Sequence, residues 1–119
     1  MTYVDGIIIP VPKKKFAAYR AMSKTFGKVC REHGPLEYRE SVADDVKMGK
    51  RTSFPRSVKL KPDETVVFAW VVYASRVARD RATRKIIKDK RLAAMMNPKS
   101  MLFDGKRMIF GGFKTFINL

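Results

Sequence analysis

One stretch of the chain limits the possible folds more than any other. Residues 65–73, TVVFAWVVY, are apolar at nearly every position. Side chains of a β-strand alternate between the two faces of a sheet, so a strand of this composition must be covered on both faces. We therefore predict a central strand here, and the fold has to supply two layers of packing around it.

The residues before this strand predict a strand, a helix and a second strand. Residues 3–9 form a β-rich run, and we expect the two prolines that follow to end it, since proline cannot donate to a sheet. Residues 13–33 carry apolar side chains at helical spacing with basic ones opposite, and Gly34 is a typical helix stop. Residues 36–43 alternate in polarity and predict an edge strand.

The residues around and after the central strand predict a long connection, a second helix and a last strand. Residues 44–63 are polar and too numerous for a tight hairpin, so we expect local structure there and a flap. Ser75 can cap a helix that runs to about residue 89, and residues 92–96 can add a turn or two. Residues 107–117 predict the last strand, which contains a pair of glycines.

The order of these elements leads to a fold class. The predicted order is strand, helix, strand, strand, helix, strand. With right-handed crossovers, this order gives a four-stranded antiparallel sheet with both helices on one face. This is the ferredoxin-like βαββαβ arrangement of the α+β class, in one domain that spans residues 1–119. No remaining segment is large and apolar enough to cover the other face. We therefore expect a homodimer in which two sheets pack face to face as an α/β barrel.

Composition narrows the class of protein further. The chain has 26 Lys and Arg against 11 Asp and Glu, and this net charge of +15 attracts polyanions. Cys30 is the only cysteine, so no intramolecular disulfide can form, and a reducing cytoplasmic location fits. No stretch approaches the roughly 18 apolar residues of a membrane span, which predicts a soluble protein. The chain has one His and one Cys, too few for the usual sets of metal ligands, so we expect no tightly bound metal or cofactor.

Several segments carry a resemblance to a known family. The chain contains YVDG near its start, REHG before LEY, the long run VADDVKMGKRTSFPRSVKLKPDETVVFAW, then SRVARDRA and FDGKRMIFGGF. Together these segments resemble the YbaA-like bacterial proteins, a family of unknown function in the dimeric α/β-barrel superfamily. The resemblance covers nearly the whole chain. It implies a fold and a dimer but no particular reaction, because barrels of this type host many activities.

Two ionisable side chains are candidates for acid–base chemistry. Asp5 lies within the first predicted strand, where a carboxylate is costly to bury without a partner, and Arg39 or Arg107 could pair with it. An acid inside the barrel with a raised pKa could move a proton, whereas a structural ion pair would explain the same residue. His33 is a nominal general base, but its place beside Gly34 is also explained by helix capping.

Aromatic residues on the strands could line a ligand pocket. Phe68 and Trp70 share one side of the central strand, predicted to face away from the helices, and Tyr3 could join them from the first strand. Packing in a dimer core would place the same residues there. The candidate ligand-binding set is Tyr3, Asp5, Arg39, Phe68, Trp70 and Arg107.

Nucleic acid is the alternative partner. Basic side chains form one stripe on each predicted helix, namely Arg20, Lys24, Lys28 and Arg31, and Arg81, Arg84 and Lys88. Binding there would be electrostatic and steeply dependent on salt. In addition, residues 68–73 match the second half of an RNA-recognition motif, although the basic residue and glycine of its first half are replaced by Val66 and Val67. An open sheet would let Phe68 and Trp70 stack on bases.

The sequence thus predicts a homodimeric barrel of unknown role that binds or transforms a small organic molecule. A basic nucleic-acid-associated protein is the alternative. No nucleotide-binding or hydrolase motif is present, so the sequence alone does not decide whether the chain is an enzyme.

Overall fold

A computed structural model describes residues 1–95, 97, 99 and 101–119 of the chain. Within them, four strands form one antiparallel sheet in the order β2-β3-β1-β4. The strands are β1 (Tyr3–Pro12), β2 (Glu37–Val42), β3 (Glu64–Tyr73) and β4 (Ile109–Lys114). The helices are α1 (Phe16–Glu32), α2 (Phe54–Ser57), α3 (Arg76–Lys88) and α4 (Lys90–Met95), with a short 3-10 turn, Lys13–Lys15, before α1. This order and pairing confirm the predicted ferredoxin-like βαββαβ fold.

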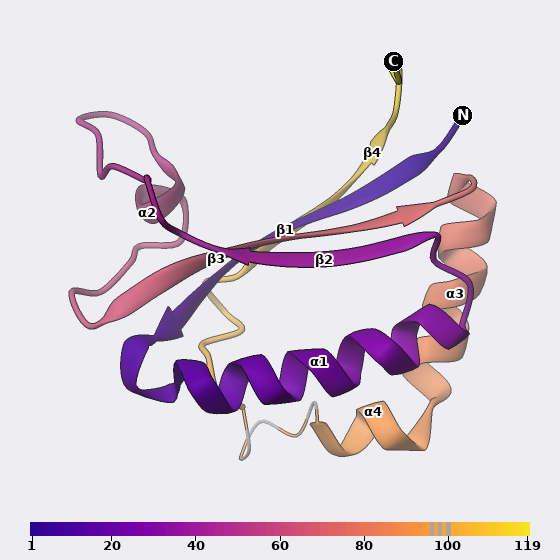
Figure 1. Ribbon diagram of the computed structural model, residues 1–119, viewed down its shortest axis with the longest axis horizontal. Coiled ribbons are helices and arrows are strands. Elements are labelled where there is room, and N and C mark those ends of the chain that lie inside the picture. The colour runs from indigo at the N-terminus through magenta and orange to yellow at the C-terminus, as the bar shows by residue number, and fades with distance from the viewer. Residues whose placement is uncertain (96, 98, 100) are drawn as a thin grey trace.

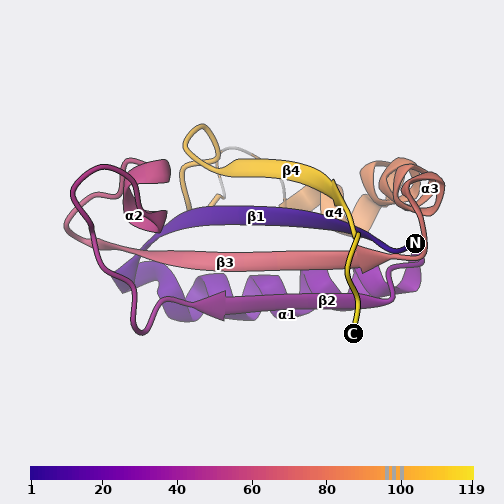
Figure 2. The same ribbon diagram turned by 90° about the horizontal axis from the view of Figure 1, so that it is seen from above.

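The helices α1, α3 and α4 cover one face of the sheet (Figures 1 and 2). Central strand β3 directs alternate side chains to the two faces, as its composition requires. The side chains that pack under the helices are those of Val67, Ala69, Val71 and Tyr73. The opposite side of β3 carries Val66, Phe68, Trp70 and Val72. We call this second side of the sheet the open face.

The helix ends follow the signals in the sequence. The hydroxyl of Ser75 accepts a hydrogen bond from the Ala78 N–H and caps α3. Gly34 follows α1 with a φ of 121°, a conformation that favours glycine. In α4, Leu92 is fully buried against Val29 and Cys30, so α4 closes one end of the helical layer. Met96 and Pro98 lie outside the described residues.

Two strand boundaries differ from those predicted. The strand β1 does not end before its prolines but continues through Pro10 to Pro12. The pairing of β1 with β4 ends at the Ile8–Ile109 pair, and beyond Ile8 the strand pairs with β3 alone. The N–H groups that Pro10 and Pro12 lack therefore cost the sheet no hydrogen bond. The last strand is shorter than predicted, because Arg107 lies outside it and forms ion pairs instead.

The open face lies between two arms. The segment around α2 rises on one side and the C-terminal tail on the other (Figure 1). Val58, just after α2, is buried against Ile8 and Val66 and anchors the first arm, which confirms local structure in the predicted flap. No helix of the described residues is long and apolar enough to cross a bilayer.

A buried ion pair ties this arm to the sheet. The Glu64 carboxylate accepts hydrogen bonds of 2.7 Å and 2.6 Å from the Arg107 guanidinium, and a third of 2.8 Å from the Lys61 N–H. Arg107 also donates to the carbonyls of Val58 and Lys59. These bonds, chiefly those from Arg107, hold the pKa of Glu64 below its ordinary value.

We predict that Glu64→Gln destabilises the fold by about 3 kcal/mol at neutral pH, because it leaves Arg107 buried without its main partner. The lowered pKa of Glu64 adds stability above the unfolded pKa of about 4.3. This contribution is lost as the pH falls through the folded value. Urea unfolding should therefore show the gap between wild type and variant shrinking in acid.

Asp104→Asn is the matched control for this experiment. Asp104 also binds Arg107, but its side chain is 42% exposed. Its loss should therefore change the free energy of unfolding far less than Glu64→Gln does. Equal effects of the two substitutions would show that the buried pair has no special role.

Candidate functional site

A cavity of about 310 Å³ lies between the helical layer and the sheet. Its wall is mostly apolar and is formed by both inner strands, α1, α3 and the segment before β4. Four of the chain's seven methionines line it: Met22, Met95, Met101 and Met108. Because methionine side chains are flexible and polarisable, such a wall can adapt to ligands of different shapes. We call this space the interior cavity.

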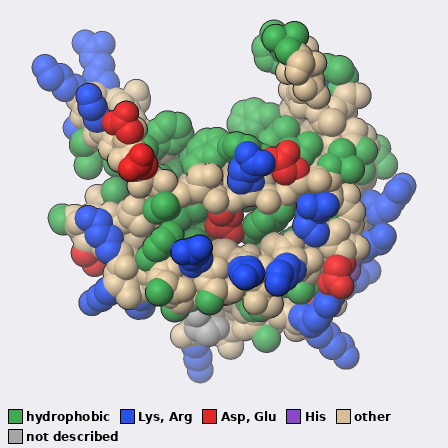
Figure 3. Space-filling view, in the orientation of Figure 1, with side chains coloured by type: hydrophobic (Ala, Val, Ile, Leu, Met, Phe, Trp, Pro, Cys, Tyr) green, Lys and Arg blue, Asp and Glu red, His purple; other side chains and the backbone are tan. Residues whose placement is uncertain are grey.

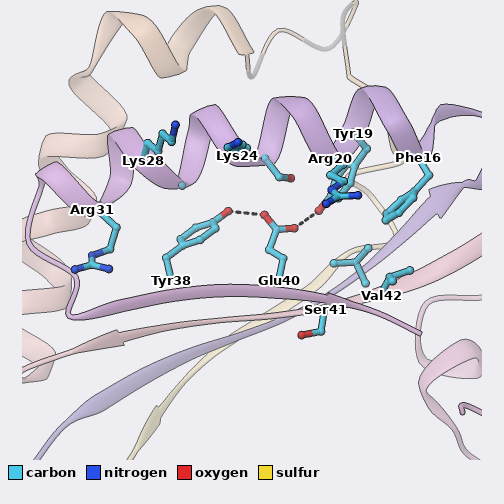
Figure 4. Close-up of a pocket in the computed structure, with 13 residues that line it drawn as sticks. Phe16, Tyr19, Arg20, Lys24, Lys28, Arg31, Tyr38, Glu40, Ser41 and Val42 are labelled. Atoms are coloured by element: carbon cyan, nitrogen blue, oxygen red, sulfur yellow. Dashed lines mark hydrogen bonds between the residues drawn. The ribbon is translucent and has the colours of Figure 1, made fainter. Parts of the chain in front are cut away.

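A carboxylate held by two phenols closes one side of the interior cavity. Glu40 points from β2 toward α1, and its Oε1 accepts a 2.5 Å hydrogen bond from the Tyr19 hydroxyl. Its Oε2 accepts a 2.6 Å bond from the Tyr38 hydroxyl (Figure 4). Burial, followed by the charge of Glu40, raises the pKa values of both tyrosines, so both phenols stay protonated and donate.

The position of Tyr38 depends on a glycine in the facing helix. A Cβ atom on Gly27 of α1 would lie 2.7 Å from the Tyr38 ring, closer than real side chains approach one another. Glycine in the interior of a helix is unfavourable, so its presence here needs a packing reason. That reason is the close approach of the ring to the backbone of α1, which places the phenol beside Glu40.

A basic groove opens on the outer side of Glu40, between α1 and β2. It has a volume of about 590 Å³ and shares Tyr19, Ser23, Tyr38 and Glu40 with the interior cavity. We call it the outer groove. Figure 3 shows basic side chains around a hollow on this face, and Figure 4 shows those that follow α1. The basic residues of its wall are Arg20, Lys24, Lys28 and Arg31.

A second carboxylate, Asp5 of β1, lies in the wall of the interior cavity. It is only 3% exposed. The Nε atom of Arg79 lies 3.8 Å from its Oδ1, which is too long for a hydrogen bond. Neither Asp5 Oδ1 nor Arg79 Nε has a hydrogen-bond partner among the described residues. A buried polar atom of this kind is costly unless something else satisfies it.

Burial dominates the electrostatics of Asp5. It raises the pKa of this carboxyl, while the nearby Arg79 charge and a hydrogen bond with Tyr73 lower it by less. Burial and the Asp5 charge likewise raise the pKa of Tyr73. A carboxyl with a raised pKa beside an apolar cavity can donate or accept a proton there.

The structure corrects the predicted surroundings of Asp5. Arg79 is the cation beside it, whereas Arg107 pairs with Glu64 and Arg39 with Glu37. The prediction was wrong because strand register cannot be read from local sequence patterns, and register decides which side chains share a face. Asp5 pairs with Val71 on the face under the helices, while Arg39 pairs with Trp70 on the open face.

The predicted aromatic set is also divided between the two faces. Phe68 and Trp70 lie on the side away from the helices, as predicted, with their rings 5.5 Å apart. Tyr3 does not join them, because it packs with Val71 under the helices and accepts a hydrogen bond from Arg79. The candidate residues therefore do not form one pocket.

The remaining candidates have structural partners. His33 Nε2 lies 2.8 Å from Asp89, which links the end of α1 to the start of α4. Cys30 is buried, and burial raises the pKa of its thiol to about 12, so the thiol is unreactive at neutral pH. Among the residues that the structure describes, no three His, Cys, Asp or Glu side chains gather as metal ligands.

Sequence reasoning missed the Glu40 site. In the alternative prediction, the stripe Arg20, Lys24, Lys28 and Arg31 is a nucleic-acid-binding surface on the outer side of the helix, yet it lines the outer groove. Alternation along β2 placed Tyr38 and Glu40 on the same face, and Tyr19 lies on the apolar side of α1. That pattern could have suggested a carboxylate among phenols, but only the approach of β2 to α1 identifies the contacts.

The fold and this site define a class: a ferredoxin-like α+β protein with a ligand-sized cavity between its helices and its sheet. Residues 2–105 match the family described as "Protein of unknown function (DUF1428)", and the chain belongs to that family. It is 43% identical to the uncharacterized protein YbaA of Escherichia coli K12 over 118 residues, 99% of each chain. YbaA of Shigella flexneri matches equally well. These matches confirm the YbaA-like resemblance.

A solved structure supports the fold independently. The structure of Rv0793 from Mycobacterium tuberculosis superposes with a TM-score of 0.61. The match covers 99% of this chain and 98% of that one, at 14% sequence identity. At this identity the likeness establishes a shared fold and carries no information on function.

We predict that Glu40→Gln lowers the apparent pKa values of Tyr19 and Tyr38, because it removes the charge that opposes their ionisation. Both should remain above the ordinary value of about 10, since burial persists. Near-ultraviolet absorbance of phenolate during an alkaline titration measures the change. Because folding raises these pKa values, their contribution to stability is present below about pH 10 and is lost as the pH rises through the folded values.

Tyr73 is an internal reference in the same titration, since its shift comes from burial and Asp5. Glu37→Gln, on the other face of β2, is the control variant. If Glu40→Gln and Glu37→Gln gave the same titration curve, Glu40 would have no influence on the phenols.

Proposed function

We propose that this protein binds a small, mostly apolar organic molecule in the interior cavity. Asp5 hydrogen-bonds the ligand and can exchange a proton with it. The observation that carries this proposal is the buried Oδ1 of Asp5, which has no partner among the described residues and lies in an otherwise apolar wall. A ligand hydroxyl or amine would satisfy it and offset the cost of its burial.

The size of the interior cavity supports the proposal. An apolar cavity of about 150 Å³ is enough to bind benzene, and this one measures about 310 Å³. A few polar groups in an apolar wall are typical of small-molecule sites, where they fix the orientation of the ligand. Here those groups are Asp5 with Tyr73 and Glu40 with its two tyrosines.

We also propose that a second copy of the chain covers the open face, as the sequence led us to expect. The open face carries Phe68, Ile109 and Phe113, the last 63% exposed. Exposed apolar surface of this kind between two arms favours self-association. Trp70 is already engaged, since Arg39 lies 5.3 Å from its ring centre and Glu37 accepts its N–H, which supports packing over base stacking. A reducing cytoplasm suits the single buried thiol.

We expect p-cresol to bind about tenfold more tightly than p-xylene, because only its hydroxyl can hydrogen-bond Asp5. Asp5→Val should remove this preference and leave the affinity for p-xylene unchanged, measured by protein NMR titration. Asp80→Asn is the control, because Asp80 also lies beside Arg79 but outside the cavity wall. Equal binding of both probes by the wild type, or a preference that survives Asp5→Val, would contradict the proposed role.

For the dimer, light scattering should give twice the chain mass of 13.7 kDa. Phe113→Asp should yield a folded monomer, because it places a charge in the apolar contact. Val77→Asp is the control, since Val77 is a 64% exposed apolar residue on α3, away from the open face. A monomeric wild type at micromolar concentration would exclude the dimer.

A further inference from the structure

The outer groove carries unbalanced positive charge. Arg20, Lys24, Lys28 and Arg31 come from successive turns of α1, and one carboxylate, Glu40, faces them. None of these four cations forms an ion pair with a described residue, whereas Arg39, Arg76, Arg79, Arg91 and Arg107 all do. The groove therefore keeps a positive potential, because its one carboxylate offsets a single charge of the four.

Glu40 offsets only one of these four positive charges. Both of its oxygens already accept hydrogen bonds from Tyr19 and Tyr38, which stabilise its negative charge locally. The carboxylate also lies at the boundary between the outer groove and the interior cavity. An anionic group would be repelled from going deeper, while the cations on α1 would hold it in the groove.

The groove is not simply a basic surface, because apolar residues share its wall. Phe16, Val42 and Val67 line it together with the cations, and its wall shares residues such as Ser23 with the interior cavity. The stripe of Arg81, Arg84 and Lys88 on α3 differs, because none of these residues lines either space. A ligand with both an apolar body and a charged head fits the first surface and not the second.

We infer that the ligand is an organic anion. Its apolar body occupies the interior cavity, and its carboxylate or similar head group lies in the outer groove against the cations of α1. This inference rests on the proposed function, since it takes the interior cavity as the binding site. It adds the chemical class of the ligand and assigns its selection to Arg20, Lys24 and Lys28.

The probe is p-tert-butylbenzoate, with its uncharged methyl ester as the matched ligand, and affinities are measured by calorimetry or NMR titration. We expect the wild type to bind the anion about tenfold more tightly than the ester, since several partly exposed charge pairs contribute. The triple variant Arg20→Gln, Lys24→Gln, Lys28→Gln should lose this preference and still bind the ester. Raising the salt to about 1 M, where the Debye length is about 3 Å, should reduce the preference in the wild type.

The control removes the same charge elsewhere. The control triple variant carries Arg81→Gln, Arg84→Gln and Lys88→Gln. It lowers the net charge as much as the α1 triple variant does, but it should keep the preference for the anion. Ser23→Phe, which places a bulky ring in the wall that the two spaces share, should weaken both ligands. Circular dichroism checks that each variant is folded.

The outcomes separate the two proposals. If the ester and the anion bind equally, with both weakened by Ser23→Phe, the class of ligand is wrong but the cavity site stands. If both triple variants lose the preference alike, only the overall charge acts, and the inference fails. If the α1 triple variant weakens a homopolymeric RNA but not p-tert-butylbenzoate, the cations serve a polyanion and the inference is overturned. If neither probe binds, both proposals are wrong.

Discussion

The sheet has two apolar faces: helices α1, α3 and α4 cover one of them, and on the other the short helix α2 packs only beside Phe68. This imbalance begins in β3, whose side chains are apolar on both sides, and it sets the organisation of the whole molecule. Beneath the helices, packing is complete enough to bury Leu92 and Val11 fully. On the open face, Phe68 and Phe113 stay exposed in the single chain. In our proposals the two faces serve different purposes, since the covered face holds a ligand and the open face meets a partner copy.

The covered face is not packed uniformly, and its gaps are where the polar groups lie. Asp5 and Glu40 each point from a strand into the space under the helices, and each is accompanied by at least one tyrosine. They differ in how far the protein itself satisfies them. Glu40 has a phenol on each oxygen, whereas Asp5 keeps an oxygen without a partner among the described residues. The protein itself satisfies the first carboxylate, whereas the second is the one that a ligand satisfies in our proposal.

Much of the fold could be predicted from the sequence, because its signals are local. Alternation in β2, the Ser75 cap and Gly34 each depend on a few adjacent residues. The site depends instead on register and on the distance between elements, which local patterns do not contain. For this reason Asp5 was identified as a buried acid but matched to the wrong arginine. The basic stripe on α1 was recognised, but its location above a groove could not be.

Gly27 links the sequence of α1 to the spacing between α1 and β2, where the outer groove and the interior cavity share their wall. Its lack of a side chain lets the Tyr38 ring lie against the helix backbone, at a cost in helix propensity of about 1 kcal/mol relative to alanine. The thickness of one aromatic ring thus sets how far β2 stands from α1. A larger residue here would force the Tyr38 ring away from the helix backbone, so in our proposals this single position shapes the wall that a ligand meets beside Glu40.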